Sequence, residues 1–176
     1  MESVRQGGVQ LGWLKRQVAD HPFRVLVTVL GVLALVSWIG LPDPHARDGH
    51  DRTPLIVAAY EGDQFQARVW HALGADLDAE EPCGTTPLMR ALQREHLQLA
   101  DWLLDQGADA AATDETGLSA LHLAARTGAE ELAGRLVKEG ADPSAEETVY
   151  GRSPIDEAEE AGHDDLARLL RDSSNS

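Results

Sequence analysis

Three kinds of residue in this chain could do chemistry: seven histidines, one cysteine and an acidic run near the C-terminus. The histidines are scattered, and no His-Glu-x-x-His sequence places two of them on one helix face as zinc ligands. The acidic run, residues 156–160, lacks the alternating ligands and central glycine of a calcium loop, so its carboxylates are expected to face water. There is no glycine-rich phosphate loop and no nucleophile beside a base. We therefore expect no catalytic residue, no metal site and no cofactor.

Cys83 is the only cysteine, so no disulfide can form within the chain. It stands just before Thr86, in a stretch that the repeats described below place in a turn. An exposed thiol in an oxidising compartment could form a mixed disulfide with another protein. Cys83 could equally be a small turn residue with no chemical role, and the sequence leaves both interpretations open.

An internal repeat supplies the elements that position these residues. One short phrase recurs at nearly equal intervals: Thr53-Pro54-Leu55, Thr86-Pro87-Leu88, Ser119-Ala120-Leu121 and Ser153-Pro154-Ile155. A second phrase recurs with the same period: Gly74-Ala75-Asp76, Gly107-Ala108-Asp109 and Gly140-Ala141-Asp142. A fixed period of about 33 residues indicates stacked supersecondary units.

The third unit shows what each repeat is expected to form. Ser119 can cap a helix whose small apolar stripe includes Ala124, and Gly128 can end that helix in a left-handed conformation. A second helix is expected from about Glu130 to Gly140, followed by turn residues. One unit is thus helix, turn, helix and extended turn, and stacking buries the apolar stripe that a single unit would leave exposed.

This pattern resembles the ankyrin repeat, most closely in residues 119–142, where Ser119-Ala120-Leu121-His122-Leu123-Ala124-Ala125 precedes Gly128 and Gly140-Ala141-Asp142. The resemblance implies an all-α repeat solenoid of four ankyrin repeats, at about 48–80, 81–113, 114–147 and 148–172. It also implies that His122 braces neighbouring turns through hydrogen bonds. In repeat two Glu95 replaces the turn glycine and is expected at positive φ, at a cost of about 1 kcal/mol.

An apolar segment precedes the repeats. Residues 25–41 contain no charged residue, and residues 23–41 reach the lower length of a membrane-spanning helix. We expect an uncleaved signal anchor, because bulky residues follow where a signal-peptide cleavage site needs small ones. Residues 1–22 would then be a cytoplasmic N-terminal segment, residues 42–47 a linker and residues 173–176 a disordered tail.

The flanking cations predict the orientation of this span. Four Lys or Arg residues precede it, at 5, 15, 16 and 24, whereas only Arg47 and Arg52 follow within a similar distance. The N-terminus is expected in the cytoplasm and the repeats across the membrane. Because a short anchor with a small trailing domain is typical of bacteria, we expect the inner membrane, spanned once, with the repeats in the periplasm.

Charge narrows the class of partner. The net charge is −15, and residues 42–176 alone carry −17. A domain this acidic is repelled by nucleic acid and by anionic lipid headgroups, which argues against nucleic-acid binding. It would attract a protein with a basic surface, although acidic outer faces also simply keep repeat proteins soluble.

The resemblance implies that a partner protein binds the concave face, formed by turn tips and the ends of first helices. The motif positions expected there are Arg52, Tyr60, Gln93, Arg94, Leu118, Arg126, Tyr150 and Arg152. Aromatic and arginine side chains are the types that anchor interfaces, but these arginines could also just balance local carboxylates. The sequence leaves these two interpretations equally open.

Taken together, these features predict a membrane-anchored, periplasm-facing ankyrin module that binds another protein as an adaptor, an enzyme accessory or an immunity-type factor. Two alternatives stay open. The chain could be a redox or enzyme-accessory factor that works through Cys83, or a secreted ankyrin effector if the apolar segment is a cleaved signal peptide.

Overall fold

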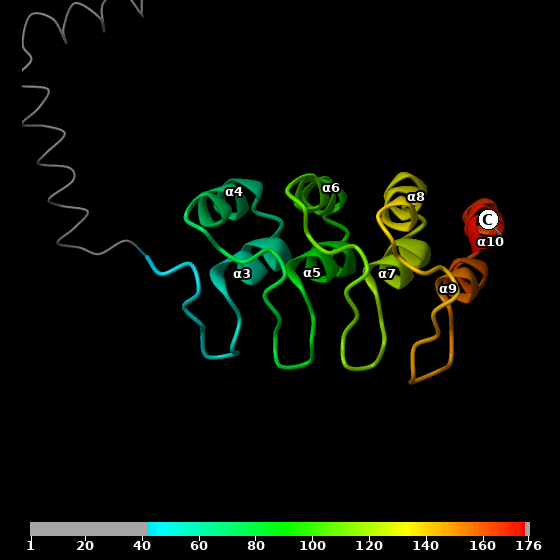
Figure 1. Ribbon diagram of the computed structural model, residues 1–176, viewed down its shortest axis with the longest axis horizontal. Coiled ribbons are helices and arrows are strands. Elements are labelled where there is room, and N and C mark those ends of the chain that lie inside the picture. The colour runs from blue at the N-terminus through cyan, green and yellow to red at the C-terminus, as the bar shows by residue number, and fades with distance from the viewer. Residues whose placement is uncertain (1–41, 175–176) are drawn as a thin grey trace, which may run out of the picture. The chain divides into compact units, whose positions relative to one another are not determined.

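The computed structural model describes residues 42–174. This part of the chain is built from helix pairs that stack side by side in two layers (Figure 1). The first helices of the pairs form one layer: α3 (Pro54–Glu61), α5 (Pro87–Gln93), α7 (Ala120–Thr127) and α9 (Pro154–Glu160). The second helices form the other: α4 (Gln64–Ala72), α6 (Leu97–Asp105), α8 (Glu130–Lys138) and α10 (Asp164–Ser174). The described residues contain no strand, only an isolated bridge between Thr113 and Ser119.

The first helices begin as the sequence predicts. Their N-cap residues are in extended conformation, and each side-chain oxygen accepts a hydrogen bond from the backbone N–H three residues later: Thr53, Thr86, Ser119 and Ser153. Proline occupies the first turn of α3, α5 and α9, where its missing N–H costs nothing. Capping thus repeats at the same place in every pair.

A left-handed residue separates the two helices of each pair. The φ values are 74° at Gly62, 60° at Glu95, 70° at Gly128 and 81° at Gly162. The expected positive φ at Glu95 is therefore confirmed, in a region that a side chain with a Cβ disfavours.

The turn glycine of repeat three also makes room for a histidine of the next repeat. A Cβ added to Gly128 would lie 2.5 Å from Cε1 of His163, which is closer than real contacts allow. Repeat two differs on both sides of this contact: its turn residue is Glu95, and Ala129 replaces the histidine in the following repeat. The same close approach joins Gly62 and His96.

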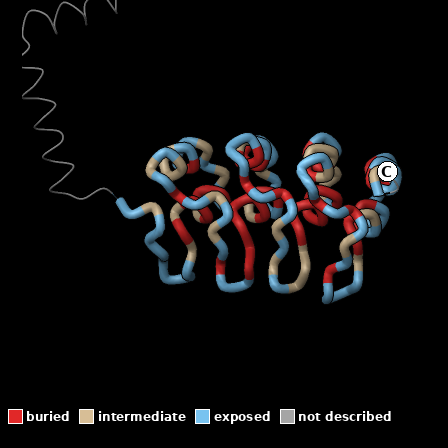
Figure 2. The backbone as a smooth tube through the Cα atoms, in the orientation of Figure 1, coloured by how far each residue is buried: buried red, intermediate tan, exposed pale blue. Residues whose placement is uncertain are grey.

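Alanine fills the contacts between layers and repeats. In the first helices the buried alanines are Ala58, Ala91, Ala124 and Ala158, and in the second helices Ala67, Ala100, Ala133 and Ala167. They are at most 3% exposed and belong to one continuous core. Buried backbone segments recur along the stacked helix pairs (Figure 2). Small side chains let the helices approach closely, as the sequence predicts.

Residues 43–47, predicted as a linker, belong instead to the compact unit that contains the repeats. The Asp43 carboxylate accepts the N–H of His45 at 2.9 Å. The same two-residue turn follows α4, α6 and α8, at Asp76, Asp109 and Asp142. These four aspartates keep the period of the repeats, so the repeat register already holds at residue 43.

Two other predictions concern the ends of the chain. The predicted span at 23–41 lies outside the described residues, and no helix between residues 42 and 174 is long and apolar enough to cross a membrane. At the C-terminus, α10 continues to Ser174, so the helix includes two residues that the sequence analysis assigned to a disordered tail. The hydroxyls of Ser173 and Ser174 donate hydrogen bonds to the carbonyls of Leu170 and Arg171 in the last turn.

Candidate protein-binding surface

Loops that project beyond the first helices form the tips of the candidate surface (Figure 1). We call them fingers one to four and define them as residues 48–52, 81–85, 114–118 and 147–152. Each finger is closed by a backbone hydrogen bond from its first residue to the carbonyl of its last, as in Asp114 to Leu118 at 2.9 Å. The bonds repeat because the sequence repeats.

An acidic residue begins every finger, and in three of them its carboxylate binds backbone N–H groups of the same loop. Asp48 accepts from His50 and Arg52, and Asp114 accepts from Thr116 and Leu118 at 2.8 and 3.0 Å. The Arg52 side chain, followed by these N–H groups, lowers the pKa of Asp48 well below its ordinary range. The sequence analysis missed these residues, although Asp48, Glu81, Asp114 and Glu147 follow the period of the repeats.

Glu81 in finger two acts differently. Its carboxylate is nearly buried and accepts hydrogen bonds from Nε and Nη2 of Arg90 on α5. The Glu81 side chain raises the pKa of Arg90, which stays cationic. Arg90 in turn donates to the side-chain oxygen of Gln93 at 2.6 Å, so Gln93, a predicted surface residue, is already engaged within the protein.

His122 ties repeat three to repeat four, as the resemblance implies. Its Nδ1 accepts the N–H of Ser119 at 3.1 Å, which leaves Nε2 to donate to the carbonyl of Arg152, 3.1 Å away. The ring is fully buried, and burial lowers the pKa of His122. Both ring nitrogens are thus used in the neutral state, which is a structural role.

The structure gathers the predicted surface residues into two groups. In the first, Arg94 lies over the ring of Tyr60 at 4.6 Å, and Arg52 lies on the same ring at 6.0 Å. In the second, Arg152 lies over the ring of Tyr150 at 4.7 Å and lines a small groove with Arg126. Leu118 is half-buried and packs against the core, so it offers less surface than expected.

The arginines of this face divide by their partners. Arg52 pairs with Asp48 at 2.7 Å, and Arg152 pairs with Glu157 at 3.2 Å and with Glu160, so these two balance local carboxylates. Within residues 42–174, neither Arg94 nor Arg126 forms an ion pair. The interpretation that these arginines balance local carboxylates therefore holds for Arg52 and Arg152, whereas the guanidinium groups of Arg94 and Arg126 stay without a carboxylate in the described residues.

Glu157 corrects one prediction. The sequence analysis placed all carboxylates of residues 156–160 in water, but Glu157 is only 6% exposed. It lies on the inner side of α9, against Arg152, because one face of this helix packs toward the core. Glu159 and Glu160 are exposed, as expected.

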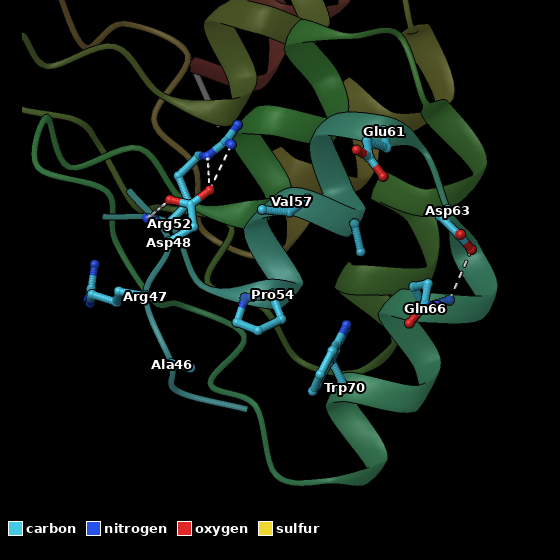
Figure 3. A pocket seen from close by; sticks show the side chains of 11 residues that line it. Ala46, Arg47, Asp48, Arg52, Pro54, Val57, Glu61, Asp63, Gln66 and Trp70 are labelled. Atoms are coloured by element: carbon cyan, nitrogen blue, oxygen red, sulfur yellow. Dashed lines mark hydrogen bonds and ion pairs between the residues drawn. The ribbon is translucent and has the colours of Figure 1, made fainter. Parts of the chain in front are cut away.

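A groove of about 510 Å³ lies at the end of the stack formed by repeat one (Figure 3). Pro54, Val57 and Trp70 line its opening, with the Asp48–Arg52 pair on one side and Asp63 capping α4 on the other. Gln66 stands here where later repeats have a buried leucine. Within the described part of the chain, no cluster of His, Cys, Asp and Glu could hold a metal ion.

Comparison with known proteins agrees with this architecture. A family model described as ankyrin repeats (3 copies) matches residues 29–114, 55–147 and 95–176. A search of curated proteins found no match. Because the family matches cover well over half of the sequence and the described helix pairs repeat in the same register, the chain belongs to the ankyrin repeat family.

Proposed function

We propose that this chain is a four-repeat ankyrin module that binds another protein non-covalently through its concave face, as an adaptor, an enzyme accessory or an immunity-type factor. The observation that carries the proposal is the pair Arg94 and Arg126. Residues 42–176 contain 28 carboxylate residues and only eleven Lys or Arg, yet these two arginines form no ion pair among the described residues. Tyr60 holds Arg94 in place through its ring face.

Such arginines are suited to an interface. An unpaired guanidinium keeps all its donors for a partner, and a ring beneath it reduces the entropy lost on binding. The strongly acidic remainder of the domain would steer a partner with a basic surface toward it. The two arginines would then donate hydrogen bonds to carbonyl or carboxylate groups of that partner at close range.

The test replaces both arginines with alanine in the full chain. The matched control replaces Arg68 and Arg168 with alanine. These residues lie on the second helices α4 and α10, and their replacement removes the same amount of positive charge. Partners are crosslinked in native membranes and recovered with each variant, and helicity is checked by circular dichroism. We expect the Arg94/Arg126 variant to lose the partner that the wild-type chain and the control both recover. Equal recovery by all three would refute binding at this face.

The membrane anchor and the periplasmic location belong to the same proposal. Their support is the uncharged stretch at residues 25–41 and the excess of cations before it. A competing assignment comes from the first family match, which begins at residue 29 and so overlaps this stretch. A C-terminal reporter enzyme active only outside the cytoplasm should be active if the anchor is correct. Activity only from a cytoplasmic reporter would reject it.

The alternatives have direct tests. A redox role requires the exposed Cys83 thiol, whose Sγ lies 3.1 Å from Oγ1 of Thr85. The Cys83→Ser variant should bind its partner as well as the wild-type chain if binding is non-covalent, and loss of capture would favour the redox role. The intact mass of the mature chain distinguishes a retained anchor from a secreted effector.

A further inference from the structure

Finger four differs from the other fingers by one extra residue. Fingers one to three reverse direction with a hydrogen bond that spans three residues, as in Gly117 N–H to Asp114 O at 2.9 Å. In finger four the bond runs from Gly151 to Glu147 at 3.0 Å and spans four. This insertion makes the last interval of the repeat pattern longer than the others.

The extra residue places two apolar side chains at the tip. Tyr150 is 74% exposed and Val149 is 59% exposed, which puts both among the most exposed large apolar residues of the described chain. The tips of the other fingers carry Gly49-His50, Pro82-Cys83 and Glu115-Thr116. Finger four is therefore the apolar tip of this surface, and an exposed aromatic on a projecting loop suits insertion into a partner.

The protein holds this tip rigidly. The Glu147 carboxylate, itself 4% exposed, accepts the N–H groups of Val149 at 2.6 Å and Tyr150 at 2.8 Å. Both the N–H and the hydroxyl of Thr148 donate to the carbonyl of Thr116 in finger three, at 2.7 and 3.0 Å. A loop ordered in advance loses little entropy when it binds.

One face of the Tyr150 ring is already supported. Arg152 lies over it at 4.7 Å, and its guanidinium is held by Glu157 and Glu160 on α9. The ring therefore keeps a defined orientation, with Val149 beside it. The tip and the residues that support it all belong to this chain, so the arrangement does not depend on a partner being present.

We propose that Tyr150 and Val149 are the primary anchor of the interface and insert into an apolar pocket on the partner protein whose rim carries Lys or Arg. This inference rests on the proposed function and specifies its partner. The basic rim follows from charge complementarity, because the domain that approaches the pocket carries a large negative charge. Arg94 and Arg126 then add contacts farther along the face.

The first experiment maps contact with a photo-crosslinking amino acid, p-benzoylphenylalanine, in the full chain in its native cells. It replaces Tyr150, Gln93 on the concave face, or Lys138 on the second helix α8 as a control. We expect positions 150 and 93 to yield the same crosslinked protein and position 138 to yield none. Capture at 93 without capture at 150 overturns this inference and leaves the proposed function standing, whereas no capture at either position rejects both.

The second experiment measures affinity for the purified crosslinked protein. Tyr150→Phe keeps the ring and should bind within about threefold of the wild-type chain, while Tyr150→Ala should bind at least tenfold more weakly. Val149→Ser should also weaken binding, and Glu115→Ala, at the tip of finger three, serves as the matched control. Raising the salt concentration should weaken binding if the rim is basic. Wild-type affinity in Tyr150→Ala would overturn the assignment of Tyr150 as the anchor. Affinity that does not change with salt would overturn the basic rim of the partner's pocket.

Discussion

The contact between Gly128 and His163 makes a sharp prediction about how neighbouring repeats are held together. Replacing Gly128 with alanine would place a Cβ at φ 70°, which costs about 1 to 2 kcal/mol for an L-residue. The same Cβ would stand 2.5 Å from the His163 ring, and overpacking of this kind typically costs about 1 to 3 kcal/mol. Gly128→Ala should therefore lower the free energy of unfolding by about 2 to 5 kcal/mol.

Two further variants separate the two costs. Gly162 occupies the same turn in the last repeat, at φ 81°, but a Cβ there would meet nothing within 4 Å. Gly162→Ala should therefore cost only the backbone strain of about 1 to 2 kcal/mol. In a chain that already carries His163→Ala, the additional Gly128→Ala substitution should cost no more than that, because the ring is gone.

The assay is urea unfolding followed by circular dichroism, with all variants measured against the wild-type chain. The difference between Gly128→Ala in the presence and absence of His163 gives the coupling between the two residues. If Gly128→Ala and Gly162→Ala lower stability equally, and the coupling is zero, then a Cβ at position 128 does not clash with the His163 ring, and the predicted steric cost is wrong.

Three other predictions concern stability. Glu95→Gly should raise the free energy of unfolding by about 1 kcal/mol in the same urea assay, since it relieves a side chain at φ 60°, and an unchanged midpoint would contradict this. Thr86→Ala removes the cap on the Met89 N–H and should lower the free energy of unfolding by about 1 kcal/mol, whereas Thr86→Ser should keep most of the wild-type stability. Because burial lowers the pKa of His122, the unfolded chain binds a proton at this ring more readily than the folded chain as the pH falls below about 6.5. Stability should therefore decrease from pH 7 to pH 5, and His122→Met, the residue of repeat two, should flatten that slope; equal slopes would refute the assignment.

The sequence predicted the repeated parts of the fold well because each rests on local chemistry. Thr86 and Ser119 each cap a first helix, and each is followed by Pro or Ala and then by Leu. A left-handed residue then follows the end of each short first helix. The exception at Glu95 was equally visible, because the register shows which residue takes the left-handed position. The repeat period therefore predicts both the left-handed turn position and the one repeat, with Glu95, in which that position is not glycine.

The binding surface was less predictable because it depends on contacts between side chains distant in the sequence. Arg152 pairs with Glu157, whereas Arg126 pairs with no carboxylate among the described residues. This difference depends on three-dimensional positions that sequence spacing alone does not give. The inward turn of Glu157 was missed for the same reason, since an acidic run on a helix normally faces solvent. The loop acids, by contrast, were available as a regular series that begins at Asp48.

Because each finger is closed from within by its own backbone bond, its outermost side chains add little to the integrity of the array. Substitutions at Cys83, Glu115 or Tyr150 should therefore be nearly silent in unfolding experiments, even where, as at Tyr150, they alter recognition. Duplicated copies of such a gene could diverge in the proteins they recognise without first having to acquire extra stability. The architecture separates the residues that evolution can vary for selectivity from those it must keep for folding.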